Sequence, residues 1–252
     1  MLEQNGIRVA AASYDSEKVL RKFSDEHRIG YALLSDTDSA VIRSFGILNT
    51  NIAPDMRSYG VPHPVEYLVA TDGAVLKKYF VPNYQHRVSG SEVALLELGV
   101  AASAGATRLT SGPLTVEVVL SSGRAFAGQQ LGVRVAFELE PGWHIYGQPV
   151  PPSYTPAAVS FESANVIEQS FEFPKPRLVN LGVPDGTLPV YEGKFDALGK
   201  LLLKFPIDAG GMEIAGTLGF QLCSDTVCEA PDSLKFKLPL VIEPFMVPKA
   251  GR

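Results

Sequence analysis

The only two cysteines of this 252-residue chain, Cys223 and Cys228, are separated by Ser-Asp-Thr-Val, a turn signal between two strand-like runs. Thiol–disulfide exchange needs a thiolate, a second thiol that can resolve a mixed disulfide, and access for a partner. A four-residue separation on a hairpin can bring both sulfurs within bonding distance. A bond across so short a loop removes little entropy from the unfolded chain, so exchange is the leading hypothesis.

Two alternatives to exchange stay open for this pair: a structural disulfide, and two thiols without a role. Asp225 and Glu229 place negative charge beside the sulfurs, and negative charge disfavours a thiolate. The pair is therefore expected to react only when a partner docks. A zinc site is not expected, because no second Cys/His pair lies at ligand spacing.

The elements before residue 101 alternate between strands and helices, which predicts an α/β domain over residues 1–100. Ile7–Ala12 is a continuous apolar run, typical of a strand buried on both faces. Further elements are expected as a helix ending at His27, a strand at Tyr31–Leu34, a helix capped by Asp36 or Asp38, a hairpin of Glu66–Ala70 and Ala74–Phe80, and a helix capped by Ser91.

The spacing of apolar residues changes where the second domain is expected to begin. Residues 101–112 are small and polar, which indicates a linker. From Pro113 the apolar residues alternate with period two, and Gly and Pro turns separate the runs, which predicts an all-β sandwich of about seven to nine strands over residues 113–245.

Composition and charge exclude several classes of function. The net charge is −5, without the basic surplus that phosphate binding needs, so no nucleic-acid partner is expected. No apolar run reaches the roughly 18 residues of a membrane span. No signal peptide is recognisable after Met1, so the chain is either cytosolic or begins after its true start.

Three motifs in the second half resemble the N-terminal domain of the thiol:disulfide interchange protein DsbD and the wider group of DsbD-like domains. They are Gly-Trp-His-Ile-Tyr ending at Tyr146, Pro-Val-Tyr-Glu-Gly around Tyr191, and Phe-Gln-Leu-Cys-Ser-Asp-Thr-Val-Cys-Glu-Ala-Pro around the cysteines. The resemblance covers about residues 112–243. It implies an immunoglobulin-like sandwich whose cysteine pair passes electrons between a donor protein and periplasmic oxidoreductases.

The same resemblance implies roles for individual residues. Cys228 would be the first nucleophile and Cys223 the resolving cysteine. Tyr146 and Trp143 would line the pocket of the pair, with Tyr191 in the pocket or its cap, and a loop at about residues 182–189 would shield it. Trp143 and Tyr146 are equally compatible with ordinary core aromatics. The cysteines here are one residue closer than in DsbD, which leaves the partner open.

Residues 6–100 resemble the later part of a peroxiredoxin or redoxin (AhpC/TSA) domain with the thioredoxin fold. The similar segments are Gly6–Asp15, Leu34–Ser39, Phe45–Asn49 and Tyr59–Pro64. Pro64 would be the family's cis-proline, and Arg87 would match the arginine that stabilises its thiolate. Because residues 1–222 contain no cysteine, both would be relics or partner contacts, and peroxidase activity is not expected.

The resulting prediction is an incomplete thioredoxin-like fold followed by an immunoglobulin-like sandwich: a thiol–disulfide oxidoreductase working through Cys223 and Cys228 without metal or organic cofactor. Its partner would be a thioredoxin-like or membrane electron-donor protein, in the periplasm or another extracytoplasmic space. A homodimer is expected through the exposed edge of the first domain. The rivals are a peroxiredoxin-type antioxidant protein whose peroxidatic segment is missing, and a binding module with a structural disulfide.

Overall fold

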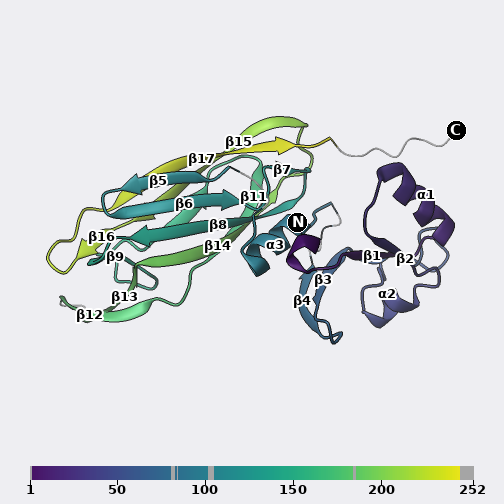
Figure 1. The fold of residues 1–252 in the computed structure, drawn as a ribbon, viewed down its shortest axis with the longest axis horizontal. Helices are drawn as coiled ribbons and strands as arrows, with labels where there is room; N and C mark the ends of the chain where they lie inside the picture. Colours follow the sequence, from purple (N-terminus) through teal and green to yellow (C-terminus); the bar gives the residue numbers. More distant parts are fainter. Residues whose placement is uncertain (1, 81–82, 84, 102–104, 184–185, 245–252) are drawn as a thin grey trace. The chain divides into compact units, whose positions relative to one another are not determined.

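The computed structural model describes residues 2–80, 83, 85–101, 105–183 and 186–244. The chain divides into two compact units, Met1–Val88 and Ser89–Arg252. Figure 1 shows an α/β unit followed by a unit made almost entirely of strands, which confirms the predicted fold class.

The first unit contains one parallel crossover and one hairpin. Strands β1 and β2 pair in parallel, and helix α1 connects them in the sequence. Strands β3 and β4 pair antiparallel and are joined by the turn at Thr71–Gly73. Its elements are η1 (Glu3–Asn5), β1 (Ala10–Ser13), α1 (Glu17–His27), β2 (Ala32–Ser35), α2 (Ala40–Ser44), β3 (Val65–Val69) and β4 (Val75–Phe80).

Strand β1 differs from the prediction in its burial. Ala10, Ala11 and Ala12 are exposed, because β2 is its only partner among the described residues. The buried carboxylate of Asp36 accepts hydrogen bonds from the backbone N–H groups of Val41 (3.1 Å) and Ile42 (2.9 Å), so the predicted cap of α2 is present. Those backbone hydrogen bonds hold the pKa of Asp36 below its ordinary value, against the raising effect of burial.

The second unit is a sandwich of two large sheets with a third, smaller sheet at one end. Its elements are α3 (Gly90–Leu98), β5 (Thr107–Ser111), β6 (Leu114–Leu120), β7 (Arg124–Ala125), β8 (Gln130–Leu139), β9 (Trp143–Tyr146), β10 (Ala158–Phe161), β11 (Val166–Glu172), β12 (Arg177–Val183), β13 (Gly186–Glu192), β14 (Lys194–Leu203), β15 (Gly210–Phe220), β16 (Leu222–Ser224) and β17 (Asp232–Ile242). The sheets run β11-β14-β8-β6-β5, β10-β15-β17-β7 and β12-β13-β9-β16.

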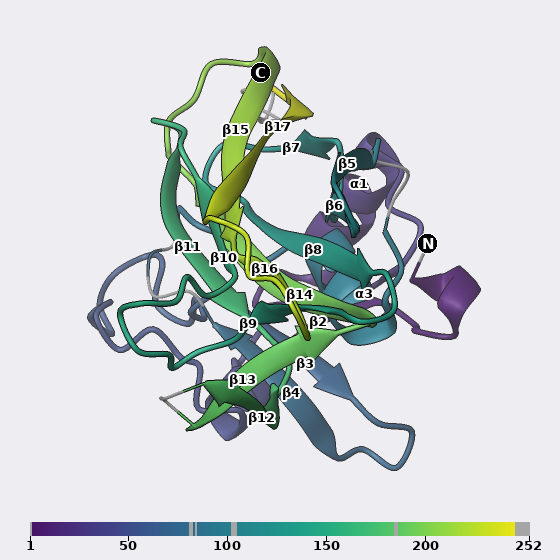
Figure 2. The same ribbon diagram turned by 90° about the vertical axis from the view of Figure 1, so that its left-hand side faces the viewer.

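Alternating burial explains why these segments form strands. In β17 the buried residues Phe236, Leu238, Leu240 and Ile242 alternate with exposed ones, so one face of the strand joins the core. Figure 2 looks at the sandwich from the end where β9, β12, β13 and β16 lie. The strands outnumber the seven to nine expected, because several are short pieces that the period-two pattern does not separate.

The boundary between the units lies earlier than predicted. Helix α3 is capped by Ser89, whose hydroxyl accepts from the Glu92 N–H at 3.0 Å, rather than by Ser91. The helix buries Val93, Ala94 and Leu95 and packs on β8, so it belongs to the second unit. Part of the expected linker, residues 107–111, is β5, which pairs with β6.

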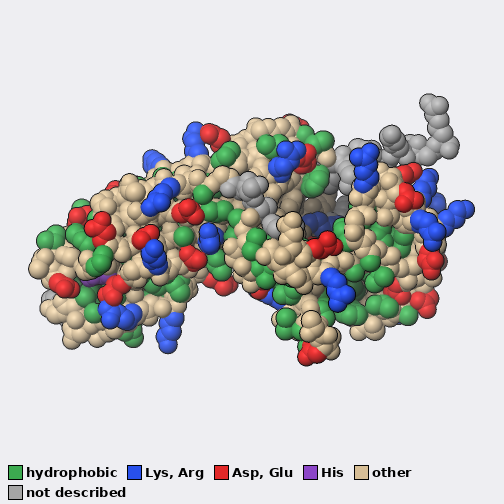
Figure 3. Space-filling view, in the orientation of Figure 1, with side chains coloured by type: hydrophobic (Ala, Val, Ile, Leu, Met, Phe, Trp, Pro, Cys, Tyr) green, Lys and Arg blue, Asp and Glu red, His purple; other side chains and the backbone are tan. Residues whose placement is uncertain are grey.

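Charged side chains of both signs are interspersed on the face of the molecule drawn in Figure 3. This distribution fits the small net charge of −5. In the described part of the chain, no helix is both long and apolar enough to cross a membrane.

Candidate functional site

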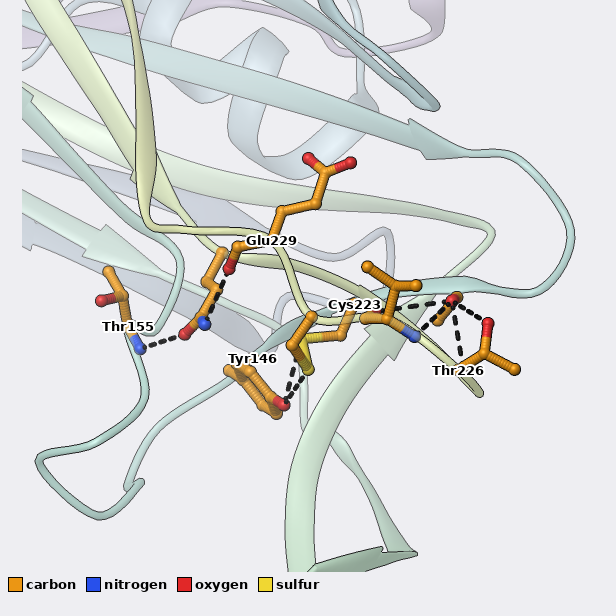
Figure 4. The surroundings of a disulfide bond; sticks show 9 residues. Tyr146, Thr155, Cys223, Thr226 and Glu229 are labelled. Atoms are coloured by element: carbon orange, nitrogen blue, oxygen red, sulfur yellow. Dashed lines mark hydrogen bonds between the residues drawn. A yellow bond between two sulfur atoms is a disulfide. The ribbon is translucent and has the colours of Figure 1, made fainter.

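Cys223 and Cys228 form a disulfide at the end of the sandwich (Figure 4). Cys223 lies in β16, and Cys228 returns beside it after a tight turn, with the two Cα atoms 4.1 Å apart. The two residues also form an antiparallel backbone bridge. The hairpin predicted from the four-residue spacing is therefore present, with the sulfurs bonded.

Ser224 fixes the turn between the cysteines. Its backbone N–H donates to the Val227 carbonyl at 2.7 Å, and its Oγ accepts from the N–H groups of Thr226 (3.3 Å) and Val227 (3.2 Å). Short side chains with a hydroxyl stabilise turns in this way. The turn holds the two cysteines at a fixed separation.

The two cysteines differ in exposure. Cys223 is completely buried, whereas Cys228 is exposed. Cys228 is therefore the cysteine of the pair that lies at the surface. This asymmetry suits the roles that the resemblance implies for the two residues, and those roles stay predictions.

Tyr146 contacts both sulfurs. Its hydroxyl oxygen lies 3.2 Å from Cys223 Sγ and 3.4 Å from Cys228 Sγ, as the dashed lines in Figure 4 show. Since disulfide sulfurs carry no proton, the hydroxyl is the donor. Tyr146 is completely buried, and its ring packs edge-on against Tyr154 with centroids 4.9 Å apart. Burial, and secondarily Tyr154, raises the pKa of Tyr146, which keeps the hydroxyl protonated.

A small apolar cluster covers the buried side of the disulfide. Its buried members are Tyr146, Leu188, Val190 and Cys223, and its partly buried members are Val150, Tyr154, Val179 and Leu181. Four of these residues come from β12 and β13. The predicted shielding loop at residues 182–189 is thus mainly part of a hairpin, of which residues 184–185 lie outside the described residues.

Gln221 connects the cysteine hairpin to the preceding loop. Its side-chain nitrogen donates to the Glu229 carbonyl at 3.0 Å, and its side-chain oxygen accepts from the Thr155 N–H at 3.0 Å. The segment after Cys228 is therefore tied to the segment that carries Tyr154. Gln221 belongs to the motif around the cysteines, but the sequence assigned it no role.

Trp143 and Tyr191 do not join Tyr146 at the disulfide. Tyr191 and Ile145 belong to the main core of the sandwich, and Trp143 packs against that core on the same face of β9 as Ile145. Successive residues of a strand point to opposite faces, so Trp143 and Tyr146 cannot share a face. Tyr191 instead donates to the Pro174 carbonyl at 2.8 Å and lines a separate pocket of about 530 Å³.

The two residues predicted in the first unit depart from their expected roles. The peptide bond before Pro64 is not among the cis bonds of the described residues, which precede Pro149 and Pro206. The trans form is the lower-energy isomer unless the surroundings select the other, so the expected cis-proline is corrected. Arg87 is exposed and donates to the neighbouring His86 carbonyl at 2.6 Å. Partial burial lowers its pKa, and Glu66 raises it.

His144 is a site residue that sequence reasoning missed. It lies directly across the β9–β16 ladder from Cys223 and two residues before Tyr146, on the same face of β9. Its ring packs edge-on against Tyr146 with centroids 5.7 Å apart. The signal in the sequence was the period of two that relates His144 to Tyr146.

Within the described residues, no group of three or more His, Cys, Asp or Glu side chains is placed to hold a metal ion. The site that the structure does contain is a dithiol pair in its oxidised form, with a buried hydroxyl donor over both sulfurs.

The fold and this site define a two-part redox chain, in which an α/β unit precedes a sandwich that carries a disulfide. Residues 1–78 match the AhpC/TSA family, and residues 117–240 match the family described as "Thiol:disulfide interchange protein DsbD, N-terminal". The chain thus joins an AhpC/TSA-type, thioredoxin-like segment to a DsbD N-terminal-type, immunoglobulin-like domain. The two families and the disulfide support a thiol–disulfide redox function.

Solved structures with similarity to the chain include the N-terminal periplasmic domain of ScsB from Proteus mirabilis, at 16% identity and a TM-score of 0.42, covering 55% of this chain and 51% of that one. The chain therefore spans about half of the ScsB structure. The reduced DsbD N-terminal domain of Neisseria meningitidis is similar at 17% identity and a TM-score of 0.30, covering 44% of this chain and 82% of that one. No curated protein matches the chain.

Proposed function

We propose that Cys223 and Cys228 transfer electrons to or from the cysteine pairs of partner proteins. The observation that carries this proposal is the pairing of an exposed Cys228 with a completely buried Cys223. A purely structural disulfide has no need of one accessible end. Tyr146 adds a hydroxyl donor that can stabilise negative charge on the sulfur that leaves.

In the accepting direction, a partner thiolate attacks Cys228 Sγ. A bond forms between the partner sulfur and Cys228, the Cys223–Cys228 bond breaks, and Cys223 leaves as a thiolate that takes up a proton. The partner's second thiol then loses its proton and attacks the partner sulfur that is bonded to Cys228. The partner's disulfide forms, and Cys228 leaves as a thiolate. The partner loses two electrons and the pair gains two, and the donating direction is the reverse.

The partner we propose is a protein with a thioredoxin-type dithiol or a membrane electron donor, and the reaction requires no metal or organic cofactor. An extracytoplasmic location is supported by the DsbD-type family match and by the oxidising compartments in which such disulfides persist. A homodimer through the exposed edge of the first domain stays a prediction, which the molar mass in solution would check.

Equilibration with glutathione or dithiothreitol, followed by thiol trapping, tests the proposal. We expect a reduction potential in the range of exchange catalysts, roughly −120 to −270 mV. A potential below about −300 mV would indicate a structural disulfide and support the binding-module alternative.

Two single variants test the assignment of roles. With oxidised glutathione as the probe, Cys223→Ser should accumulate a stable mixed disulfide at the exposed Cys228. Cys228→Ser should react at least about tenfold more slowly, because its remaining thiol is buried. Equal rates in the two variants would contradict the assignment.

A further inference from the structure

His144 occupies a central position in the sheet that carries the disulfide. On one side it pairs with Cys223 of β16, and on the other with Glu192 of β13. Residues directly opposite each other in an antiparallel pair have Cβ atoms about 4.5–5.5 Å apart and point to the same face. The imidazole therefore lies on the disulfide face of the sheet, within reach of the Cys223 side chain.

The imidazole has an unused buried polar atom. His144 is only 3% exposed, and its Nε2 has no hydrogen-bond partner in the described part of the structure. A buried polar atom without a partner is costly and calls for an explanation. In the oxidised state neither sulfur carries a proton that it could donate to this nitrogen.

Charged and titratable groups face His144 from each neighbouring element. Glu192 lies on β13, Asp225 in the turn after β16, and Tyr146 on its own strand, while Arg177 of β12 bonds both carboxylate oxygens of Glu192 at 2.6 Å. Burial lowers the pKa of His144, which keeps the imidazole neutral and able to accept a proton. Glu192 and Asp225 favour the protonated form once it is made, and Arg177 opposes it.

We propose that His144 is the proton acceptor for the Cys223 thiol when Cys223 resolves a mixed disulfide held at Cys228. The inference rests on the exchange function proposed above. It explains why a histidine is buried opposite the resolving cysteine with one nitrogen unpaired.

At the start of the step the partner is bonded to Cys228 through a mixed disulfide. The Sγ–H bond of Cys223 breaks and its proton moves to Nε2 of His144, as the Cys223 sulfur attacks Cys228 Sγ. The Cys223–Cys228 bond forms and the bond from Cys228 to the partner breaks. The partner leaves as a thiolate carrying the electron pair of that bond and later takes a proton from water, while His144 returns its proton to solvent.

Stopped-flow oxidation of the reduced protein by dithiobis(nitrobenzoic acid) tests the inference. The first release of the coloured thiolate reports formation of the mixed disulfide at Cys228, and the second reports resolution by Cys223. We compare the wild type with His144→Gln and His144→Asn, which keep polar side chains but not the basicity. His27→Gln, on α1 of the first unit, is the matched control.

We expect the second phase of both His144 variants to slow by about 100-fold near pH 6.5, the size of a typical general-base contribution. The defect should fade above about pH 9, where the thiol ionises without help. The rate of the first phase should be unchanged in both His144 variants, which indicates that they present Cys228 as the folded wild type does. Both phases of His27→Gln should have the wild-type rates.

Second phases that are unchanged in both His144 variants, at every pH, would overturn the role of His144 and leave the exchange function standing. A wild type that forms no mixed disulfide, or never resolves one, would instead overturn the exchange function itself. The two failures are therefore distinguishable within one experiment.

Discussion

The two faces of the β12-β13-β9-β16 sheet share four strands but have different surroundings. One face carries Ile145, Tyr191 and Leu222 into the large core of the sandwich. The other carries Tyr146, Val190 and Cys223 into a small cluster that adjoins the exposed Cys228. Alternate residues of one strand can therefore have separate roles, some packing in the core and others contacting the disulfide.

The separation has a physical basis. On the core face, apolar groups are removed from water on all sides, and their packing dominates stability. On the disulfide face, the buried Tyr146 hydroxyl bonds both sulfurs, and the buried His144 ring packs against Tyr146. Substitutions on the two faces should therefore affect different measurements.

Ile145→Ala should produce the largest change in stability. The side chain is completely buried in the main core, and truncating such a residue costs about 2–5 kcal/mol of the free energy of unfolding. Denaturant unfolding measures this loss, and the reduction potential of the disulfide should stay unchanged. A large shift in the potential would show that the two faces are coupled.

The pH dependence of stability should be the next effect in size. The folded pKa of His144 is lowered, so the unfolded chain binds a proton below about pH 6.5 that the folded chain does not. The stability linked to His144 is thus fully present above about pH 6.5 and falls as the pH falls toward the folded pKa. The slope for one proton cannot exceed about 1.4 kcal/mol per pH unit.

Denaturant unfolding of the wild type and His144→Gln between about pH 5 and pH 8 checks this dependence. The variant should lose stability less steeply than the wild type on acidification. Parallel curves for the two proteins would mean that His144 titrates alike in the folded and unfolded chains.

Tyr146→Phe should give the smallest effect and the sharpest contrast. Removing a hydroxyl that bonds both sulfurs costs about 0.5–1.5 kcal/mol, which corresponds to exchange with glutathione slowed by roughly 2- to 10-fold. Tyr191→Phe is the matched control, because it loses a hydrogen bond of similar kind to Pro174 on the core face. Equal exchange rates in the two variants would argue against a role for the Tyr146 hydroxyl.

The spacing of apolar residues and of the two cysteines was enough to predict the architecture of this protein and its reactive pair. The change from mixed to period-two apolar spacing predicted an α/β unit before a sandwich, because that spacing reflects which face of each element is buried. The types and spacing of Cys223 and Cys228 predicted a hairpin that brings the sulfurs together, because a short turn confines both residues. The family resemblance pointed to Tyr146, which does contact the pair.

Tertiary structure decided the rest of the site. Strand β16 pairs with β9, about eighty residues earlier in the chain, and only that register places His144 opposite Cys223. The same long-range packing assigned α3 to the second unit and gave Tyr191 to the core. Registers between distant strands depend on the sum of many side-chain contacts, which no local period encodes, so the partners of the sulfurs emerged only in the folded chain.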